Sequence, residues 1–143
     1  MDDFRETLGY NLLKLYKGYF YLLNTRLSAF NLYESQDMLL RQLWDEDGLP
    51  QAELTRRLGV EAATVSKAVE RMENAGFLRR QPDPDDARAN RIYLTEQGRG
   101  LEQPVKQVWQ EIEAQVFAHM TAEERMLLRR LVLQMRENLT SAT

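Results

Sequence analysis

One continuous stretch, residues 59–95, constrains the fold of this chain more than any other segment. It opens with a turn at Gly59, continues as an amphipathic run carrying small polar and basic side chains, and reaches a second glycine at Gly76. Two short apolar segments then flank a loop that contains two prolines and three aspartates. Glycine is a common helix end, and apolar segments around a polar loop favour a hairpin. The stretch therefore predicts a helix at about 62–75 and a β-hairpin with strands at 77–81 and 91–94.

Apolar residues at steps of three and four predict further helices before this stretch. A long N-terminal helix is expected to end at Asn31, because asparagine tolerates the left-handed conformation used at helix ends. A second helix is expected from about Glu34 to Glu46, with Met38 facing inward beside leucines 39, 40 and 43. Pro50 is typical of the first turn of a third helix, which stops at Gly59.

Two more helices are predicted after the hairpin. Thr95 is expected to cap a long helix that is kinked between Gly100 and Pro104, since proline breaks the hydrogen-bond pattern there. Thr121 and Glu124 have the spacing of a capping box that opens the last helix. We expect that helix to bury one apolar face, formed by Leu128, Leu131, Val132, Met135 and Leu139. The terminal helices carry more apolar surface than a lone pair can hide, which favours a second subunit as their cover.

Composition and charge restrict the function classes only mildly. The formal net charge is −3, and residues 50–99, with 9 Lys+Arg against 8 Asp+Glu, form the least acidic third. A normally solvated surface explains that distribution about as well as nucleic-acid binding does. The absence of cysteine excludes disulfides and thiolate metal sites. The acidic N-terminus lacks a signal-peptide pattern, and no apolar run approaches 18 residues, so we expect a cytoplasmic protein without a membrane span.

Residues typical of metal sites and enzymes do not form a convincing set. His119 is the only histidine and has no cysteine or histidine partner for zinc. Asp83, Asp85 and Asp86 lack the remaining ligands of a calcium loop. The segment Gly98-Arg99-Gly100 lacks the strand-before-helix context of a nucleotide-binding loop. We therefore expect no cofactor, no metal and no enzymatic activity. Turnover of a phenolic compound without an added cofactor would favour the alternative, a ligand-processing enzyme.

Four short motifs stand in order along the chain: Leu-Thr-Arg-Arg-Leu-Gly-Val at 54–60, Ala-Thr-Val-Ser-Lys at 63–67, Asp-Pro-Asp-Asp-Ala-Arg at 83–88 and Ile-Tyr-Leu-Thr-Glu-Gln-Gly-Arg at 92–99. Together they resemble the MarR family of winged-helix transcription factors. The resemblance implies a mainly α fold with a small β-wing, in which N- and C-terminal dimerisation helices flank a winged helix-turn-helix domain. It implies a single domain over residues 1–143, with a DNA-binding lobe at 34–95 and a helical dimerisation region at 1–30 and 96–143.

The resemblance also implies a function. It predicts a sequence-specific transcriptional regulator, a repressor, that binds pseudo-palindromic promoter DNA as a homodimer. The helix at about 62–75 is expected to enter the major groove. In the wing, Asp86 is expected to support the loop and Arg88 to reach the minor groove, where narrow A·T-rich segments attract a guanidinium. The chain departs from the family pattern at Glu61 and Ala87, and both changes reduce the positive charge available for DNA.

Candidate residues follow from these assignments. The DNA-binding set is Ala62, Ala63, Thr64, Ser66, Lys67, Arg71, Arg79, Arg80, Asp86, Arg88 and Arg91. Strand alternation implies that the adjacent arginines 79 and 80 do not face DNA in the same way. Relatives respond to small aromatic acids or phenols, so a pocket for such an effector is predicted from Tyr16, Tyr19, Arg26, Tyr33, Met38 and Trp44. The alternatives are ordinary solvated helix residues, aromatics that only fill the core, and a winged-helix module that binds another protein instead of DNA.

Overall fold

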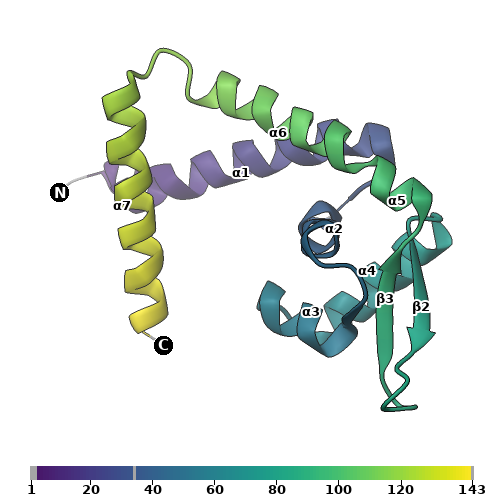
Figure 1. Ribbon diagram of the computed structural model, residues 1–143. Helices are drawn as coiled ribbons and strands as arrows, with labels where there is room; N and C mark the ends of the chain where they lie inside the picture. Colours follow the sequence, from purple (N-terminus) through teal and green to yellow (C-terminus); the bar gives the residue numbers. More distant parts are fainter. Residues whose placement is uncertain (1–2, 34, 143) are drawn as a thin grey trace. The chain divides into compact units, whose positions relative to one another are not determined.

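The computed structural model describes residues 3–33 and 35–142, and they form two compact units (Figure 1). The first unit reaches Trp109 and the second begins at Gln110. The elements before the sheet are η1 (Phe4–Glu6), α1 (Leu8–Leu27), η2 (Ser28–Phe30), α2 (Gln36–Asp45), β1 (Leu49–Pro50), α3 (Gln51–Leu58) and α4 (Ala62–Asn74). They are followed by β2 (Leu78–Pro82), β3 (Asn90–Leu94), α5 (Glu96–Gly100), α6 (Glu102–Val116) and α7 (Ala122–Ser141). The predicted fold class, mainly helical with a small β-wing, is confirmed.

The N-terminal helices end and begin where side-chain chemistry favours it. The Thr7 hydroxyl accepts the backbone N–H of Tyr10 and so caps α1. Asn31 closes η2 in the left-handed conformation, with φ of 60°, as expected from its residue type. The second helix, α2, begins at Gln36; the predicted start at Glu34 lies outside the described residues.

The inward face of α2 differs from the prediction at one position. Leu39, Leu40 and Leu43 are buried, but Met38 is 41% exposed, so its predicted inward orientation is wrong. The helix instead turns its first polar residues inward: Asp37 is completely buried and Gln36 nearly so. Pattern reasoning missed this because it assigns polar residues to the solvent face by default.

The turn between α3 and α4 gives the helix-turn-helix its shape. Gly59 ends α3 in the left-handed conformation, with φ of 65°, which glycine adopts without strain. Pro50 lies one residue before α3 and belongs to β1, a two-residue strand that the sequence did not predict. On α4, Val65, Val69 and Met72 are buried, and their burial turns the opposite face of the helix outward.

A three-stranded antiparallel sheet, in the order β1-β3-β2, joins the short strand before α3 to the hairpin after α4. Leu78 pairs with Leu94 at one end of the hairpin and Pro82 with Asn90 at the other, while Leu49 of β1 pairs with Ile92. The predicted strands are confirmed to within one residue. The hairpin extends away from the helices of the first unit, so its tip is a projecting wing (Figure 1).

The C-terminal helices confirm two local predictions. Helix α5 is capped by Thr95 and separated from α6 at Leu101, which is the predicted break. The Thr121 and Glu124 capping box opens α7. On the face of α7 that is expected to be buried, Leu128 is half-buried, whereas Leu131, Val132, Met135 and Leu139 are exposed within this chain, Leu139 by 73%, so their burial by a second subunit stays a prediction. No helix among the described residues has the length and apolar character to cross a membrane.

Candidate nucleic-acid interface

The outward face of α4 presents small polar and basic side chains to solvent. Thr64, Lys67 and Arg71 are all exposed, and their spacing of three and four residues aligns them along one side of the helix. Ala62 and Ala63 are exposed at its first turn, and their small side chains let another molecule approach the backbone closely. Ser66 is half-buried, so it lies toward the edge of this face. The face has the width and chemistry that a major groove accepts.

The tip of the wing is organised by backbone hydrogen bonds and by Asp86. The Asp86 carboxylate accepts the backbone N–H of Arg88 at 3.0 Å, and its carbonyl accepts the N–H of Ala89 at 3.0 Å. The Asp83 N–H donates to the Ala89 carbonyl at 2.9 Å and closes the loop. These bonds fix the backbone at Arg88. Its side chain is exposed and forms no ion pair with the residues that the structure describes.

Arg91 is held inside the wing. Its Nε donates to the Asp83 carboxylate at 3.0 Å, and its Nη1 donates to the Gly48 carbonyl at 3.0 Å. The backbone N–H of Asp85 and, after it, the Arg91 guanidinium lower the pKa of Asp83. This cation therefore ties the hairpin to the loop before β1.

The two adjacent arginines of β2 have different environments, as strand alternation predicts. Arg80 is half-buried and pairs with Glu73 of α4 at 3.2 Å, while its backbone N–H donates to the same carboxylate. Arg79 is exposed, and its guanidinium carbon lies 5.0 Å from the centre of the Tyr93 ring. Arg80 thus braces the wing against α4, whereas Arg79 stays available on the outside of the hairpin.

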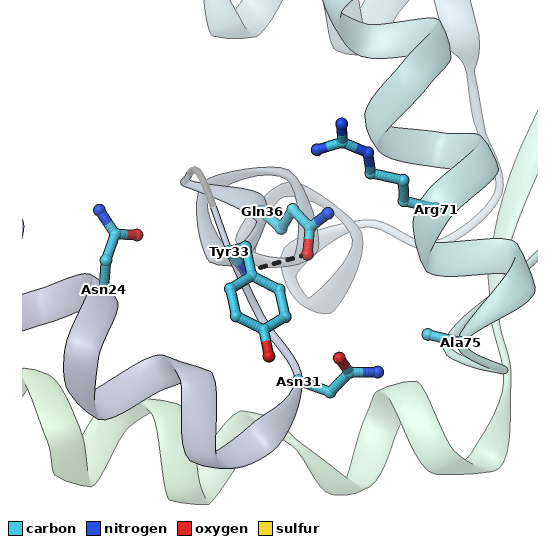
Figure 2. Close-up of a pocket in the computed structure, with 6 residues that line it drawn as sticks. All are labelled: Asn24, Asn31, Tyr33, Gln36, Arg71 and Ala75. Atoms are coloured by element: carbon cyan, nitrogen blue, oxygen red, sulfur yellow. Dashed lines mark hydrogen bonds between the residues drawn. The ribbon is translucent and has the colours of Figure 1, made fainter.

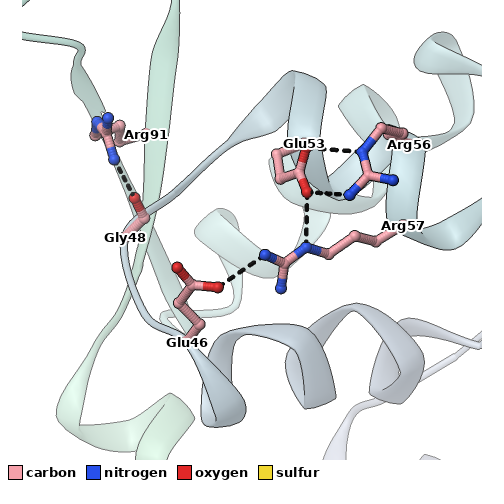
Figure 3. A network of polar contacts seen from close by, with 6 residues as sticks. All are labelled: Glu46, Gly48, Glu53, Arg56, Arg57 and Arg91. Atoms are coloured by element: carbon pink, nitrogen blue, oxygen red, sulfur yellow. Dashed lines mark hydrogen bonds and ion pairs between the residues drawn. The ribbon is translucent and has the colours of Figure 1, made fainter.

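A further group of arginines lies on α3 and was not among the predicted site residues. Glu53 accepts from both nitrogens of the Arg56 fork and from Nε of Arg57, and Arg57 also pairs with Glu46 at 2.8 Å (Figure 3). Arg56 and then Arg57 lower the pKa of Glu53 to about 2. The sequence carries the signal, because acidic residues three and four positions before arginine on a helix predict such pairs.

A cavity of about 570 Å³ opens between α1, α2 and α4. Figure 2 shows its lining, which is Asn24, Asn31, Tyr33, Gln36, Arg71 and Ala75. The Gln36 side chain accepts the backbone N–H of Tyr33 at 3.1 Å. Arg71 also lines a second, smaller hollow between α2 and α4, together with Gln36, Thr64, Lys67 and Ala68. Arg71 therefore borders both hollows and is also exposed on α4.

Three of the residues predicted for an effector pocket, Tyr16, Tyr33 and Met38, border three different hollows. Of the six, only Tyr33 lines the cavity of Figure 2. Tyr16 borders a separate shallow hollow along α1 together with Lys17, and Met38 borders a groove between α2, α3 and α4. Arg26 is half-buried on α1. Tyr19 packs with its ring 6.0 Å from Trp109, and Trp44 donates its indole N–H to the Gly98 carbonyl.

Comparison with known proteins shows what this chain is similar to. Residues 32–89 match the model of the MarR family. The chain is 29% identical over 108 residues to the HTH-type transcriptional regulator YdgJ of Bacillus subtilis, a match that covers 76% of this chain and 66% of YdgJ. The chain therefore spans slightly less than two thirds of that relative's length.

Solved structures give the same fold over nearly the whole chain. A MarR transcriptional regulator from Methanosarcina mazei is 25% identical, with a TM-score of 0.81 over 93% of this chain and 96% of its own. A mutant MarR from Escherichia coli, solved in complex with operator DNA, is 23% identical, with a TM-score of 0.82 over 94% of this chain and 99% of its own. With a projecting wing beside an outward-facing α4, this chain is similar in fold to MarR-family regulators, and its residues 32–89 match the model of that family.

Proposed function

We propose that this chain is a sequence-specific DNA-binding transcriptional repressor that binds pseudo-palindromic promoter DNA as a homodimer. The observation that carries the proposal is the combination of two exposed basic elements in one unit. Lys67 lies on the outward face of α4, and Arg88 lies at a wing tip whose backbone is fixed by Asp86. The related structure with bound operator DNA supports the same use of this fold.

The environments of the predicted residues divide their proposed roles. Thr64 and Lys67, with Ala62 and Ala63 at the helix start, are placed to meet base edges and phosphates in the major groove. We assign Arg88 to the minor groove, because DNA binding need not first break an ion pair of its guanidinium within the described part of the chain. Arg80 and Arg91 already pair with carboxylates of this chain, so we assign them to support of the wing rather than to direct contact.

Apolar surface on the terminal helices supports the homodimer. On α1, Leu8, Leu12, Leu13, Leu15 and Tyr16 are exposed, and on α7 the exposed set is Met126, Leu127, Leu131, Val132, Leu133, Met135 and Leu139. Exposed apolar faces of this extent mark protein–protein contacts. We therefore keep residues 1–30 and 96–143 as the dimerisation region and residues 34–95 as the DNA-binding lobe. A dimer would place two α4 helices about 34 Å apart, one turn of B-DNA.

The cavity beside Arg71 supports release by a small aromatic acid or phenol. The amides of Asn24 and Asn31 and the Tyr33 phenol offer hydrogen bonds, and Arg71 offers a cation for a carboxylate or phenolate. Because the Arg71 side chain is also exposed on α4, on the same side as Thr64 and Lys67, a ligand that engages it competes with DNA for the same guanidinium. Such a ligand relieves repression only by binding the DNA-incompetent arrangement more tightly.

Selection of bound duplexes from a random pool at moderate salt tests the proposal. The expected product is an inverted repeat with half-sites about 10 base pairs apart, bound with an affinity that falls steeply with salt. Failure to enrich any duplex, with capture of a protein partner instead, would establish the interaction module in place of the repressor. A screen of aromatic acids and phenols for release of the selected duplex then tests the effector.

A further inference from the structure

A buried polar cluster connects α2 to α6 at the end of the first unit. The Asp37 side chain is fully buried, and its Oδ2 accepts the indole N–H of Trp109 at 2.9 Å. Nε of Arg41 lies 4.0 Å from the same oxygen, and its guanidinium carbon lies 4.3 Å from the centre of the Trp109 ring. One indole is thus fixed at its edge by a carboxylate and on its face by a cation.

The buried carboxylate in this cluster is unfavourable for the stability of the fold. Asp37 Oδ1 is buried without a hydrogen-bond partner among the residues that the structure describes. Burying a carboxyl oxygen without a hydrogen-bond partner carries a desolvation penalty that destabilises the folded chain. An apolar residue of similar volume would carry no such penalty. Stability alone therefore does not explain an aspartate here. A carboxylate, unlike a leucine side chain, accepts a directional hydrogen bond. That bond fixes the orientation of the Trp109 ring.

The residue that this hydrogen bond fixes, Trp109, lies at the boundary between the two units. Trp109 is in the middle of α6 and is the last residue of the first unit, and the second unit continues from the next residue along the same helix. The other tryptophan makes a parallel connection: Trp44, near the end of α2, donates to the Gly98 carbonyl on α5. Both ends of α2 are thereby attached to the segment that leads into the second unit.

We propose that Asp37 is a positioning residue that, through Trp109, sets the direction in which α6 leaves the DNA-binding lobe and so determines which half-site spacing the dimer accepts. The inference rests on the proposed function, since a spacing preference requires a dimer on DNA. One added base pair moves the second half-site by about 3.4 Å and rotates it by about 35° around the duplex axis. A rigid connection rejects such a site, whereas a loosened one accepts it.

The test compares operators that have the selected spacing with operators lengthened by one base pair. Wild type and Asp37→Asn, whose amide oxygen still accepts the indole N–H, are expected to prefer the selected spacing equally. Asp37→Leu removes the acceptor of the Asp37–Trp109 hydrogen bond and Trp109→Phe removes its donor. Each variant is expected to reduce the preference for the selected spacing about tenfold. Leu43→Val, a buried substitution on α2 outside the cluster, controls for lost stability and keeps the preference. Unchanged spacing preference in folded Asp37→Leu and Trp109→Phe would overturn the proposal, as would an equal loss in Asp37→Asn.

A second measurement needs no DNA and separates this inference from the proposed function. The indole N–H of Trp109 is observed by NMR in the full-length protein, and its exchange with solvent is expected to accelerate at least about tenfold in Asp37→Leu but not in Asp37→Asn. If the wild-type protein binds no duplex, the proposed repressor function is wrong. The exchange measurement still tests whether Asp37 holds the Trp109 ring. Full protection of the Trp109 indole in Asp37→Leu would show that the carboxylate does not hold the ring.

Discussion

Removal of the Arg88 side chain separates DNA contact from folding. Only the backbone N–H of Arg88 takes part in the wing turn, where it donates to Asp86, and alanine keeps that N–H. The guanidinium is exposed and bonds no carboxylate in the described part of the chain, so Arg88→Ala is expected to change the free energy of unfolding by less than about 0.5 kcal/mol.

The effect on DNA binding is expected to be much larger. A close groove contact is worth about 1–3 kcal/mol, so Arg88→Ala should weaken operator binding about 5- to 150-fold for each wing engaged. Arg88→Lys keeps the charge but loses the planar fork, and its affinity should lie between wild type and alanine. Fluorescence anisotropy with the selected operator, beside thermal unfolding of each variant, gives both quantities. Equal affinity of wild type and Arg88→Ala would refute the role of the wing.

Four further outcomes follow from the same contacts. Lys67→Ala should reduce the slope of log affinity against log salt by about 0.9 for each protomer, measured by anisotropy from low to moderate salt; an unchanged slope removes Lys67 from the phosphate contacts. Arg91→Ala leaves Asp83 unpaired and should destabilise the wing, so amide exchange in β3 should rise along with the loss of affinity, and exchange as slow as in wild type would contradict this. The pKa of Glu53 is lowered in the folded chain to about 2, so its contribution is complete above the unfolded value of 4.5 and is lost as pH falls toward 2; Glu53→Gln should flatten acid unfolding in that window, and an identical pH profile would count against the network. Leu131→Glu on α7 should shift the protein toward monomer by sedimentation, and an intact dimer would place the interface elsewhere.

The local structure was largely predictable because it depends on neighbouring residues. Gly59 and Asn31 end their elements in the left-handed conformation that their residue types tolerate, and the Thr121 capping box forms as its spacing requires. The break at Leu101 follows from the glycines and the proline around it. Such features need no knowledge of distant contacts.

Predictions that depended on tertiary contacts were less successful. The inward orientation of Met38 was wrong because α2 buries Asp37, whose partner Trp109 lies 72 positions further along the chain. The exposure of the apolar face of α7 agrees with the expectation that a second subunit covers it, and that interface stays a prediction. Of the six residues predicted for an effector pocket, Tyr16, Tyr33 and Met38 line three different hollows, since helical periodicity gives a face of a helix but not the element packed against it.

Footprinting of the full-length protein on its selected operator tests the central claim most directly. Two exposed α4 faces in one dimer predict two equally protected major-groove segments about one helical turn apart, each flanked by minor-groove protection that disappears in Arg88→Ala. A single protected segment, or protection that is the same in wild type and Arg88→Ala, would contradict the account.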